Sequence, residues 1–420
     1  MCEEKLGQSL ELGMQPVCNH FLNKKDDKEK LYRLSIVQCQ ECGLVQLGHR
    51  FPSQALKPVH EWITYAEPEE HLDNLTEHIM KTINIKESGS KAKIKAKIKA
   101  QMRAKIIGMS FKDDTLLMRL EKNGFAVERL KLKEDLGIED EHVGVETIQA
   151  QLKPDNIKKI IKKKGAADIV IARHILEHAY NLKEFITSLK MLIKPKGYLI
   201  LEVPDCGCAF ERLDYPIIWE EHTLYFTPET FKNTLARNGL DISYFNAFEY
   251  ALENSLVIIA QLAGPKANSK KANSKSSINK EIINKEAIKK EKERFNVFCK
   301  SFDKRKTEIT KFLKENKTDN SEIALLGAGH FACGFINFLG LKDYVDMVID
   351  DNIHKKGLLM PGSALPIIGS EALLGKKIKL CLLSLNPRTE EKVVQENQEF
   401  INQGGIFRSI FASSRYAIKL

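Results

Sequence analysis

Two segments of the chain combine histidine with glutamate in a pattern that suits proton-transfer chemistry. In the first, His174, Glu177 and His178 lie in the sequence RHILEH, directly after an apolar run. In the second, Glu221 and His222 lie in WEEHTLYF, about forty residues further on. A carboxylate beside an imidazole sets its tautomer and raises its basicity, as a general base near neutral pH requires. The alternative for each segment is a structural histidine, buried in the core, capping a helix or packed on aromatic neighbours.

Strands and helices alternate around these segments between residues 105 and 262. The sequences KIIGMS, ADIVIA and PKGYLILEVP are typical of strands, whereas DDTLLMRLEKNG, NLKEFITSLKMLI and TPETFKNTLARNG are typical of helices. Thr227 and Pro228 predict the cap and the first position of the last of these helices. The alternation predicts an α/β fold with a doubly wound, mostly parallel sheet. Ligands of such sheets bind outside the carboxyl ends of the strands, where the RHILEH segment would lie.

Cysteines near the N-terminus predict a small metal-binding module. Cys39 and Cys42 form a CxxCG knuckle with the spacing of two thiolate ligands for zinc. Cys2, and Cys18 with His20 in QPVCNHF, are the candidates for the remaining ligands. The alternative is a metal-free module with spare thiols. Nine cysteines scattered through the chain do not form a disulfide framework, and they favour a reducing compartment.

A second alternating unit begins at Glu322. There LLGAGHFACG follows a predicted strand and opens a helix, and Asp350 and Asp351 end the next strand. Glycines in this position let a phosphate approach a helix N-terminus, so we expect a Rossmann-like domain over residues 321–420. An NAD-binding oxidoreductase module is the alternative for this domain. The tyrosine and lysine pair of short-chain dehydrogenases does not follow these glycines at the required spacing.

The remaining segments limit the classes of partner. The formal net charge of +9 comes largely from lysine-rich stretches at residues 90–105 and 266–280, which lack interleaved aromatic residues. We therefore expect solvated helix faces or linkers and no nucleic-acid groove. The sequence lacks a run of about 18 apolar residues, which predicts no membrane span and a cytoplasmic protein. Residues 265–320 are expected to form a linker and one long amphipathic helix over 281–316.

Taken in order, these segments resemble the sugar C-methyltransferase family over nearly the whole chain. The RHILEH turn and KPKGYLILEVP resemble the fourth and fifth strand regions of class I methyltransferases, and WEEHTLYF resembles the EHxxYF loop of the family. The run DDNIHKKGLLMPGSALPIIG resembles its C-terminal domain. The resemblance implies a zinc-binding module over residues 1–55, a methyltransferase core over 56–264 and the Rossmann-like domain at the C-terminus.

The resemblance also implies a reaction and roles for particular residues. S-adenosylmethionine would methylate a carbon atom of a nucleotide-linked keto-deoxysugar. His222 would remove the proton beside the keto group with Glu221 as its partner, and His178 would donate a hydrogen bond to the enolate. Tyr65, in ITYAEPEEH, falls where the family places a catalytic tyrosine. Trp219 replaces a tyrosine of the family, so oxygen or nitrogen methylation of another small molecule is the alternative.

The cofactor loop departs most from the family. Its sequence IIGMSFKDDTLL holds a single glycine, Gly108. We expect the space beside Gly108 to be open so that the backbone can approach the cofactor, with Ser110 and His174 also in contact with it. Lys131 stands at the end of the second strand, where the family has a carboxylate for the ribose hydroxyls. The candidates to replace that carboxylate are three nearby acids, Glu134, Asp135 and Glu146.

Overall fold

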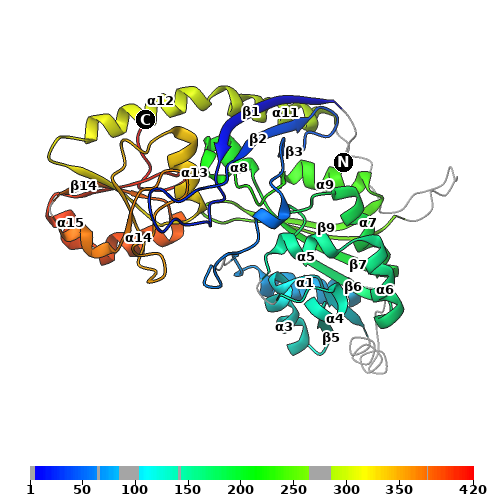
Figure 1. The fold of residues 1–420 in the computed structure, drawn as a ribbon. Helices are drawn as coiled ribbons and strands as arrows, with labels where there is room; N and C mark the ends of the chain where they lie inside the picture. Colours follow the sequence, from blue (N-terminus) through cyan, green and yellow to red (C-terminus); the bar gives the residue numbers. More distant parts are fainter. Residues whose placement is uncertain (1–4, 64–66, 85–103, 141–142, 264–284, 376) are drawn as a thin grey trace.

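The computed structural model describes residues 5–63, 67–140, 143–263, 285–375 and 377–420, except for 85–103. Cys2, Tyr65 and nearly all of both lysine-rich stretches lie outside the described residues. The described chain forms three sheets, one small and antiparallel and two larger ones flanked by helices (Figure 1). The predicted α/β fold class is confirmed.

The central sheet has the strand order β5-β4-β6-β7-β10-β9. Its first four strands are parallel, and β9 and β10 form an antiparallel hairpin at one edge. The strands are β4 (Lys105–Gly108), β5 (Ala126–Arg129), β6 (Ala167–Arg173), β7 (Ile193–Pro204), β9 (Leu240–Phe248) and β10 (Ser255–Leu262). Residues 130–166 contribute helices α4, α5 and α6 and, in their described part, no strand.

Alternate residues of these strands face two different helical layers. Ile106, Ile169 and Ile200 pack against α1 and α3, whereas Ile107, Val170 and Leu199 face the opposite side. Because side chains in a strand alternate between faces, a strand buried on both sides reads as a continuous apolar run. The helices are α1 (Leu72–Asn84), α3 (Asp114–Lys122), α4 (Leu132–Leu136), α5 (Val145–Gln151), α6 (Pro154–Lys164), α7 (Leu182–Leu192), α8 (Gly207–Arg212) and α9 (Pro228–Arg237).

The predicted start of α9 is confirmed. The Thr227 side chain accepts a hydrogen bond from the backbone N–H of Thr230, and Pro228 takes the first helical position. The cap satisfies a backbone donor that the helix itself cannot satisfy. It therefore fixes where the loop that carries His222 ends and the helix begins.

The N-terminal sheet borrows a strand from the core. Its order is β1-β2-β3-β8, and all its pairs are antiparallel. Three strands come from the N-terminus, but β8 begins two residues after His222. The strands are β1 (Leu6–Gln15), β2 (Tyr32–Cys39), β3 (Val45–Leu47) and β8 (Leu224–Tyr225). Through β3 and β8, the N-terminal module is thus hydrogen-bonded to the segment that directly follows the Glu221–His222 loop.

The C-terminal sheet is parallel throughout, with the order β13-β12-β11-β14-β15. Its strands are β11 (Glu322–Leu326), β12 (Met347–Ile349), β13 (Ile367–Ile368), β14 (Ile378–Leu383) and β15 (Ile406–Ser409). Its helices are α13 (His330–Leu339), α14 (Pro387–Glu396) and α15 (Gln398–Asn402). The Rossmann-like character predicted for this part of the chain is confirmed.

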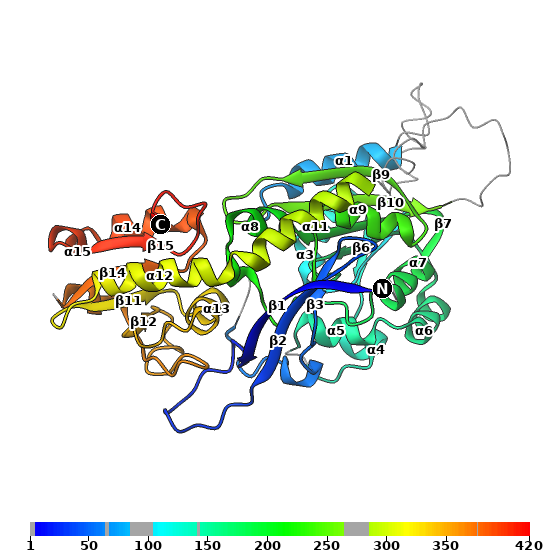
Figure 2. The same cartoon turned by 90° about the horizontal axis from the view of Figure 1, so that it is seen from above.

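Two helices, and not the single one predicted, run along the molecule above both larger sheets (Figure 2). They are α11 (Lys285–Lys300) and α12 (Phe302–Asn316), and Ser301 separates them with φ −85° and ψ −7°. A regular α-helix has a ψ of about −42°, and the value at Ser301 lies well away from it. The helix is therefore interrupted there, although the chain keeps its direction. α11 contacts α8, α9 and β1, whereas α12 lies beside the C-terminal sheet.

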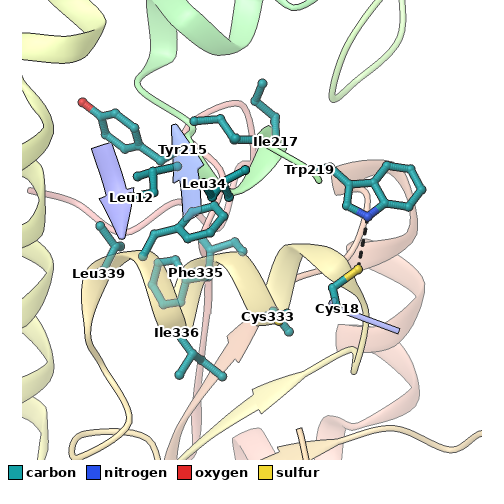
Figure 3. Close-up of a cluster of buried hydrophobic side chains, with 14 of the residues drawn as sticks. Leu12, Cys18, Leu34, Tyr215, Ile217, Trp219, Cys333, Phe335, Ile336 and Leu339 are labelled. Carbon is teal, nitrogen blue, oxygen red and sulfur yellow. Dashed lines mark hydrogen bonds between the residues drawn. The ribbon is translucent and has the colours of Figure 1, made fainter. Parts of the chain in front are cut away.

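One apolar cluster joins the N-terminal sheet, the α11–α12 pair and the C-terminal domain. Leu12 and Leu34 of the first sheet, Tyr215 of the core and Phe335 of α13 converge in it (Figure 3). Phe298 of α11 packs on Tyr215 with their ring centroids 4.4 Å apart. A continuous core across three parts of a chain fixes their relative positions. Among the described residues, no helix is both long and apolar enough to cross a membrane.

Candidate active site

The two histidine-bearing segments meet at the carboxyl end of β6. The rings of His178 and His222 lie perpendicular to each other, with centroids 4.8 Å apart and an interplanar angle of 88°. Backbone contacts hold the segments together, because Leu224 N–H donates to the carbonyl of Glu177 at 3.0 Å and Thr223 Oγ1 donates to that of Ala179 at 2.8 Å. The sequence predicted a sheet-edge position for the RHILEH segment only, and the structure brings the WEEH loop there as well, with the two imidazoles in contact.

Two cavities lie on either side of His222. The first cavity has a volume of about 260 Å³ and the second about 280 Å³, and Glu67, Trp219 and His222 line both. The first is bordered by the Phe111–Lys112 turn and by the residues from Val143 to Glu146. The second is lined from the core by His174, Glu177, Pro204, Leu252 and Glu253, and from the C-terminal domain by His330, Phe331 and Asn386.

A carboxylate contacts His178 inside the first cavity. Glu146 Oε1 lies 2.6 Å from His178 Nδ1, and both side chains are almost fully buried. Burial alone would lower the pKa of His178, but the adjacent Glu146 carboxylate raises it above its ordinary value. This contact favours the protonated, hydrogen-bond-donating form of the His178 ring.

The surroundings of His222, unlike those of His178, favour the neutral form of the imidazole. Its ring is partly exposed to the cavities, and its backbone N–H donates to the carbonyl of Trp219 at 3.1 Å. Desolvation lowers its pKa well below the ordinary value, and the neighbouring charge of His178 lowers it further. The indole of Trp219 also stacks on His330, with centroids 4.5 Å apart, and burial lowers the pKa of His330 to about 4. His222 is thus a neutral imidazole that can accept a proton.

The Glu221 carboxylate is held by the N-terminal module and not by His222. Its Oε1 accepts a hydrogen bond from Asn19 Nδ2 at 3.0 Å. Its ligand atom lies within 4.8 Å of those of Glu146 and His178. Burial and the nearby charge of Glu146 raise the pKa of Glu221 well above its ordinary value. The expected pairing of Glu221 with His222 is therefore replaced by a grouping with His178.

A buried ionic network lies beneath the second cavity. Glu202 of β7 contacts His71 Nε2 at 3.0 Å and His174 Nε2 at 3.1 Å, and it accepts a hydrogen bond from Arg173 Nε at 2.5 Å. Burial would raise the pKa of Glu202, but the charges of Arg173 and His174 hold it well below its usual range. Burial would likewise lower the pKa of His174, yet Glu67 and Glu202 raise it to about 10. His174 is therefore a fixed cation in the wall of the second cavity.

The expectation of open space beside Gly108 is wrong. A side chain at Gly108 would meet Leu117 Cδ1 at 2.7 Å and Asp113 Cβ at 3.0 Å, so this glycine serves packing inside the protein. The Asp113 carboxylate occupies the turn, where it accepts hydrogen bonds from the backbone N–H groups of Met109, Ser110 and Arg173. The Ser110 side chain is buried and caps the following 3-10 turn, η2 (Phe111–Asp113). The loop folds around an internal carboxylate, and the accessible surface shifts to Phe111 and Lys112.

Two of the three candidate ribose carboxylates lie away from the cavities. Glu134 is exposed on α4, and the Asp135 carboxylate pairs with Lys163 and Lys164 at 3.0 Å each. Of the three acids, Glu146 alone lines the first cavity. Tyr65 lies outside the described residues, although Ile63 and Glu67, on either side of it in the sequence, line this cavity.

The N-terminal CxxCG knuckle forms a tight turn around Cys42, but Cys18 does not belong to it. The N–H of Gly43 donates to the carbonyl of Cys39 at 3.0 Å, and Gly43 adopts φ +73°, which closes the turn around Cys42. Leu6 pairs with Cys39 at one end of the β1–β2 hairpin, and Gln15 pairs with Tyr32 at the other. Nine residue steps of strand span roughly 30 Å, and Cys18 follows the far end.

Cys18 therefore cannot share an ion with Cys39 and Cys42, because zinc ligands lie about 2.0–2.3 Å from the metal. Its thiol instead accepts a hydrogen bond from Trp219 Nε1 at 3.1 Å (Figure 3). His20, two residues after Cys18, is excluded from the knuckle on the same grounds. Two thiolates of the knuckle fit zinc, and Cys2, the other candidate ligand, lies outside the described residues.

Sequence reasoning missed several residues of the site. Lys112 Nζ contacts Glu67 Oε1 at 2.6 Å across the mouth of the first cavity. His330 was placed only in a glycine-rich turn, yet it faces the second cavity from another domain. Lys112 lies in the predicted cofactor loop and His330 in the glycine-rich turn of the C-terminal domain. The sequence did not reveal that these two distant segments contact the cavities. Asp350, which directly follows the strand after the glycine-rich turn of the C-terminal domain, accepts hydrogen bonds from the N–H of Ala328 and from Lys355 Nζ, each at 2.9 Å.

Three family models match successive parts of the chain. Residues 1–56 match a "Putative zinc binding domain", residues 114–244 a "Methyltransferase domain" and residues 255–411 a "C-methyltransferase C-terminal domain". The C-methyltransferase NovU of Streptomyces niveus is 21% identical over 406 residues, which cover 94% of this chain and 90% of that protein.

Similar solved structures cover about half of the chain. Magnesium protoporphyrin IX methyltransferase from Synechocystis PCC 6803, with bound S-adenosylhomocysteine, matches at 12% identity and a TM-score of 0.28, covering 48% of this chain and 90% of that one. The glycopeptide N-methyltransferase MtfA, complexed with S-adenosylmethionine, matches at 8% identity and a TM-score of 0.28, covering 47% and 95%.

The matched domains follow one another in the order that the sequence predicted. The methyltransferase match covers most of the central sheet, and the C-terminal match covers the domain that supplies His330 to the second cavity. The chain is therefore an S-adenosylmethionine-dependent methyltransferase whose N-terminus matches a putative zinc-binding domain and whose C-terminus matches a C-methyltransferase domain.

Proposed function

We propose that this enzyme methylates a carbon atom beside the keto group of a nucleotide-linked deoxysugar or a similar small keto compound, in the cytoplasm. The observation that carries the proposal is the position of His222, a neutral imidazole in the wall shared by two cavities. A base that lies between the methyl donor and the carbon acid can remove the proton from the carbon while the donor is already positioned to transfer its methyl group.

The first cavity suits the methyl donor. It opens between the turn that follows β4 and the start of α5, at the carboxyl ends of parallel strands, where such sheets bind ligands. Glu67, Phe111 and Lys112 also border an adjoining open hollow of about 640 Å³, which gives a larger ligand room to extend. The carboxylates of Glu67 and Glu146 line the first cavity, and negative charge there favours a cationic sulfonium.

The second cavity suits the acceptor. The C-terminal domain supplies three of its lining residues, His330, Phe331 and Asn386, so that domain would contribute to acceptor selection. The methyltransferase core supplies His174 and Glu177. A pocket at a domain interface is a common place for a small substrate. His174 is a cation that would face the polar part of the acceptor.

The proposed reaction needs two different imidazoles. His222 takes the proton from the carbon, the C–H electron pair forms the enolate double bond, and the carbonyl oxygen gains negative charge. His178 lines the first cavity beside His222, so the carbonyl of the acceptor would extend past His222 to reach it. A hydrogen bond from protonated His178 to that oxygen would lower the barrier, because the charge develops only during the reaction. The enolate carbon then attacks the methyl group, the new C–C bond forms as the S–C bond breaks, and S-adenosylhomocysteine leaves.

The test uses the full chain with methyl-labelled S-adenosylmethionine and a panel of nucleotide-linked keto-deoxysugars. We expect product NMR to show a methyl group on carbon, and solvent deuterium to enter the substrate at that carbon when S-adenosylhomocysteine replaces the donor. The exchange should disappear in His222→Asn, whereas calorimetric binding of S-adenosylhomocysteine should persist. A product methylated on oxygen or nitrogen, formed without exchange, would overturn the enolate mechanism.

A further inference from the structure

We propose that Glu146 is a positioning residue, which orients His178 so that its second ring nitrogen faces the acceptor oxygen. The significance of His178 rests on the proposed function, but the pairing itself does not. Glu146 was considered from the sequence only as a partner for the ribose of the cofactor. Its geometry in the folded chain points to a different contact.

The distance between the two groups identifies a direct pairing. Glu146 Oε1 lies 2.6 Å from His178 Nδ1, and the side chains are 3% and 6% exposed, respectively. A charge-assisted contact of this length is short even for a strong hydrogen bond. With Nδ1 in contact with the carboxylate, the imidazole has only Nε2 left to contact a ligand. The carboxylate thus fixes both the tautomer and the orientation of the ring.

The sequence around Glu146 is built to admit this carboxylate. Gly144 caps α5, and a side chain there would place its Cβ 2.5 Å from Glu146 Oε2. Glycine at that position leaves the space in which the second carboxylate oxygen lies. Glu146 also stands in the first turn of α5, where the helix dipole favours a negative charge. The absence of a side chain at Gly144 therefore keeps the space for the carboxylate open.

Other charged groups face His178 from each neighbouring segment. Glu177 precedes it on the same turn, Lys112 approaches from the turn after β4, and Glu221 and His222 approach from the loop before β8. Glu177 adds to the effect of Glu146, whereas Lys112 opposes it. Glu146 exerts the strongest attraction because it is in direct contact.

Two other uses of Glu146 fit the distances less well. Ligands that share a divalent cation at about 2.1 Å lie roughly 3 Å or more from each other, which exceeds the 2.6 Å observed. A ribose partner would present its carboxylate to open space, but Oε1 lies 2.6 Å from His178 Nδ1 and Oε2 lies beside Gly144. Each alternative nevertheless predicts a distinct result in the same experiment.

The experiment follows the His178 ring by NMR in the full chain labelled with ¹⁵N-histidine and bound to S-adenosylhomocysteine. His178→Asn assigns the signal. In Glu146→Gln we expect the titration midpoint of His178 to fall by about one pH unit or more, with an intermediate shift in Glu146→Asp. Thr147→Ala, on the same helix, should leave the midpoint unchanged. Affinity for S-adenosylhomocysteine should stay within about twofold in all of them, whereas kcat of Glu146→Gln should fall about 10- to 100-fold.

An unchanged His178 midpoint in Glu146→Gln would overturn the proposal. A tenfold loss of S-adenosylhomocysteine affinity with an unchanged midpoint would assign Glu146 to the cofactor instead. Stoichiometric binding of Mn²⁺ that Glu146→Gln abolishes would assign it to a metal site. The NMR and binding measurements need no acceptor. The role of Glu146 can therefore be judged even if the carbon-methylation proposal fails.

Discussion

At the scale of single residues, the site separates two chemically identical side chains by their surroundings. His178 touches a carboxylate and is held as a cation, whereas His222 is desolvated among other imidazoles and stays neutral. Neighbouring titratable groups whose pKa values are pushed apart divide the roles of acid and base. Their perpendicular rings, 4.8 Å apart, allow both to reach one bound molecule.

The pH dependence of the reaction should reflect this difference. Because desolvation lowers the pKa of His222, the base stays unprotonated at pH values where an ordinary histidine is charged. We expect kcat/KM to hold as the pH falls through about 6.5 and to decline only at lower pH. His222→Asn should lower kcat about 10²- to 10⁴-fold. His49→Asn, whose ring contacts Ser35 in the N-terminal sheet, is the matched control. A loss of activity centred at pH 6.5 would contradict a lowered pKa.

At the scale of elements, the turn after β4 shows how a glycine can be required for packing. Gly108→Ala would force a methyl group to within 2.7 Å of Leu117 and 3.0 Å of Asp113. We expect a loss of about 1–3 kcal/mol in the free energy of unfolding, because overpacking displaces the helix behind the turn. Gly329→Ala is the control, since a methyl group there would have no atom within 4 Å and the φ of Gly329 is −124°. Urea denaturation of both variants measures the free energy of unfolding. Equal stability of the two would show that the turn accommodates the extra methyl group without cost.

The knuckle between β2 and β3 makes a second prediction at this scale. Cys39→Ser should release zinc from the purified chain, as measured by elemental analysis, because one thiolate is lost from a tetrahedral site. Cys18→Ser should retain the metal, since Cys18 lies at the opposite end of the hairpin. Loss of zinc from Cys18→Ser but not from Cys39→Ser would reverse the assignment of the site.

The sequence predicted what depends on local pattern and missed what depends on distant contacts. Thr227 and Pro228 predicted the start of α9 because a cap acts on its own helix. The apolar run of β6 and the turn after it predicted that His178 would lie at a sheet edge. The pairing of Glu146 with His178 and the burial of Cys18 against Trp219 join residues far apart in the chain, which periodicity does not encode. The break at Ser301 was missed because the apolar spacing continues through it.

At the scale of the whole molecule, the apolar cluster around α11 and α12 ties the two larger domains together. Phe298 is fully buried there and packs on Tyr215 and Phe210, with ring centroids 4.4 Å and 5.0 Å away. The hydroxyl of Tyr215 also donates to the carbonyl of Phe298 at 2.8 Å. The second cavity depends on this arrangement because both domains line it.

Truncation at this joint should therefore affect stability and activity together. Phe298→Ala should cost about 3–5 kcal/mol in the free energy of unfolding and raise KM for the acceptor, as His330 moves away from His222. Val297→Ala, the next residue and 56% exposed, should change neither. Denaturation and steady-state kinetics of the pair check both effects. An unaltered KM in a destabilised Phe298→Ala would show that the acceptor does not depend on the domain interface.

The pairing of β3 with β8 connects the proposed zinc knuckle to the loop that carries His222. Val45 pairs with Tyr225 and Gln46 with Leu224, only two or three residues beyond His222, and the carbonyl of Cys42 accepts a hydrogen bond from Asn233 of α9. Loss of zinc from the knuckle would therefore loosen the strand pairing next to His222, the proposed base. We expect zinc deficiency to lower activity by displacing this imidazole before the rest of the chain unfolds.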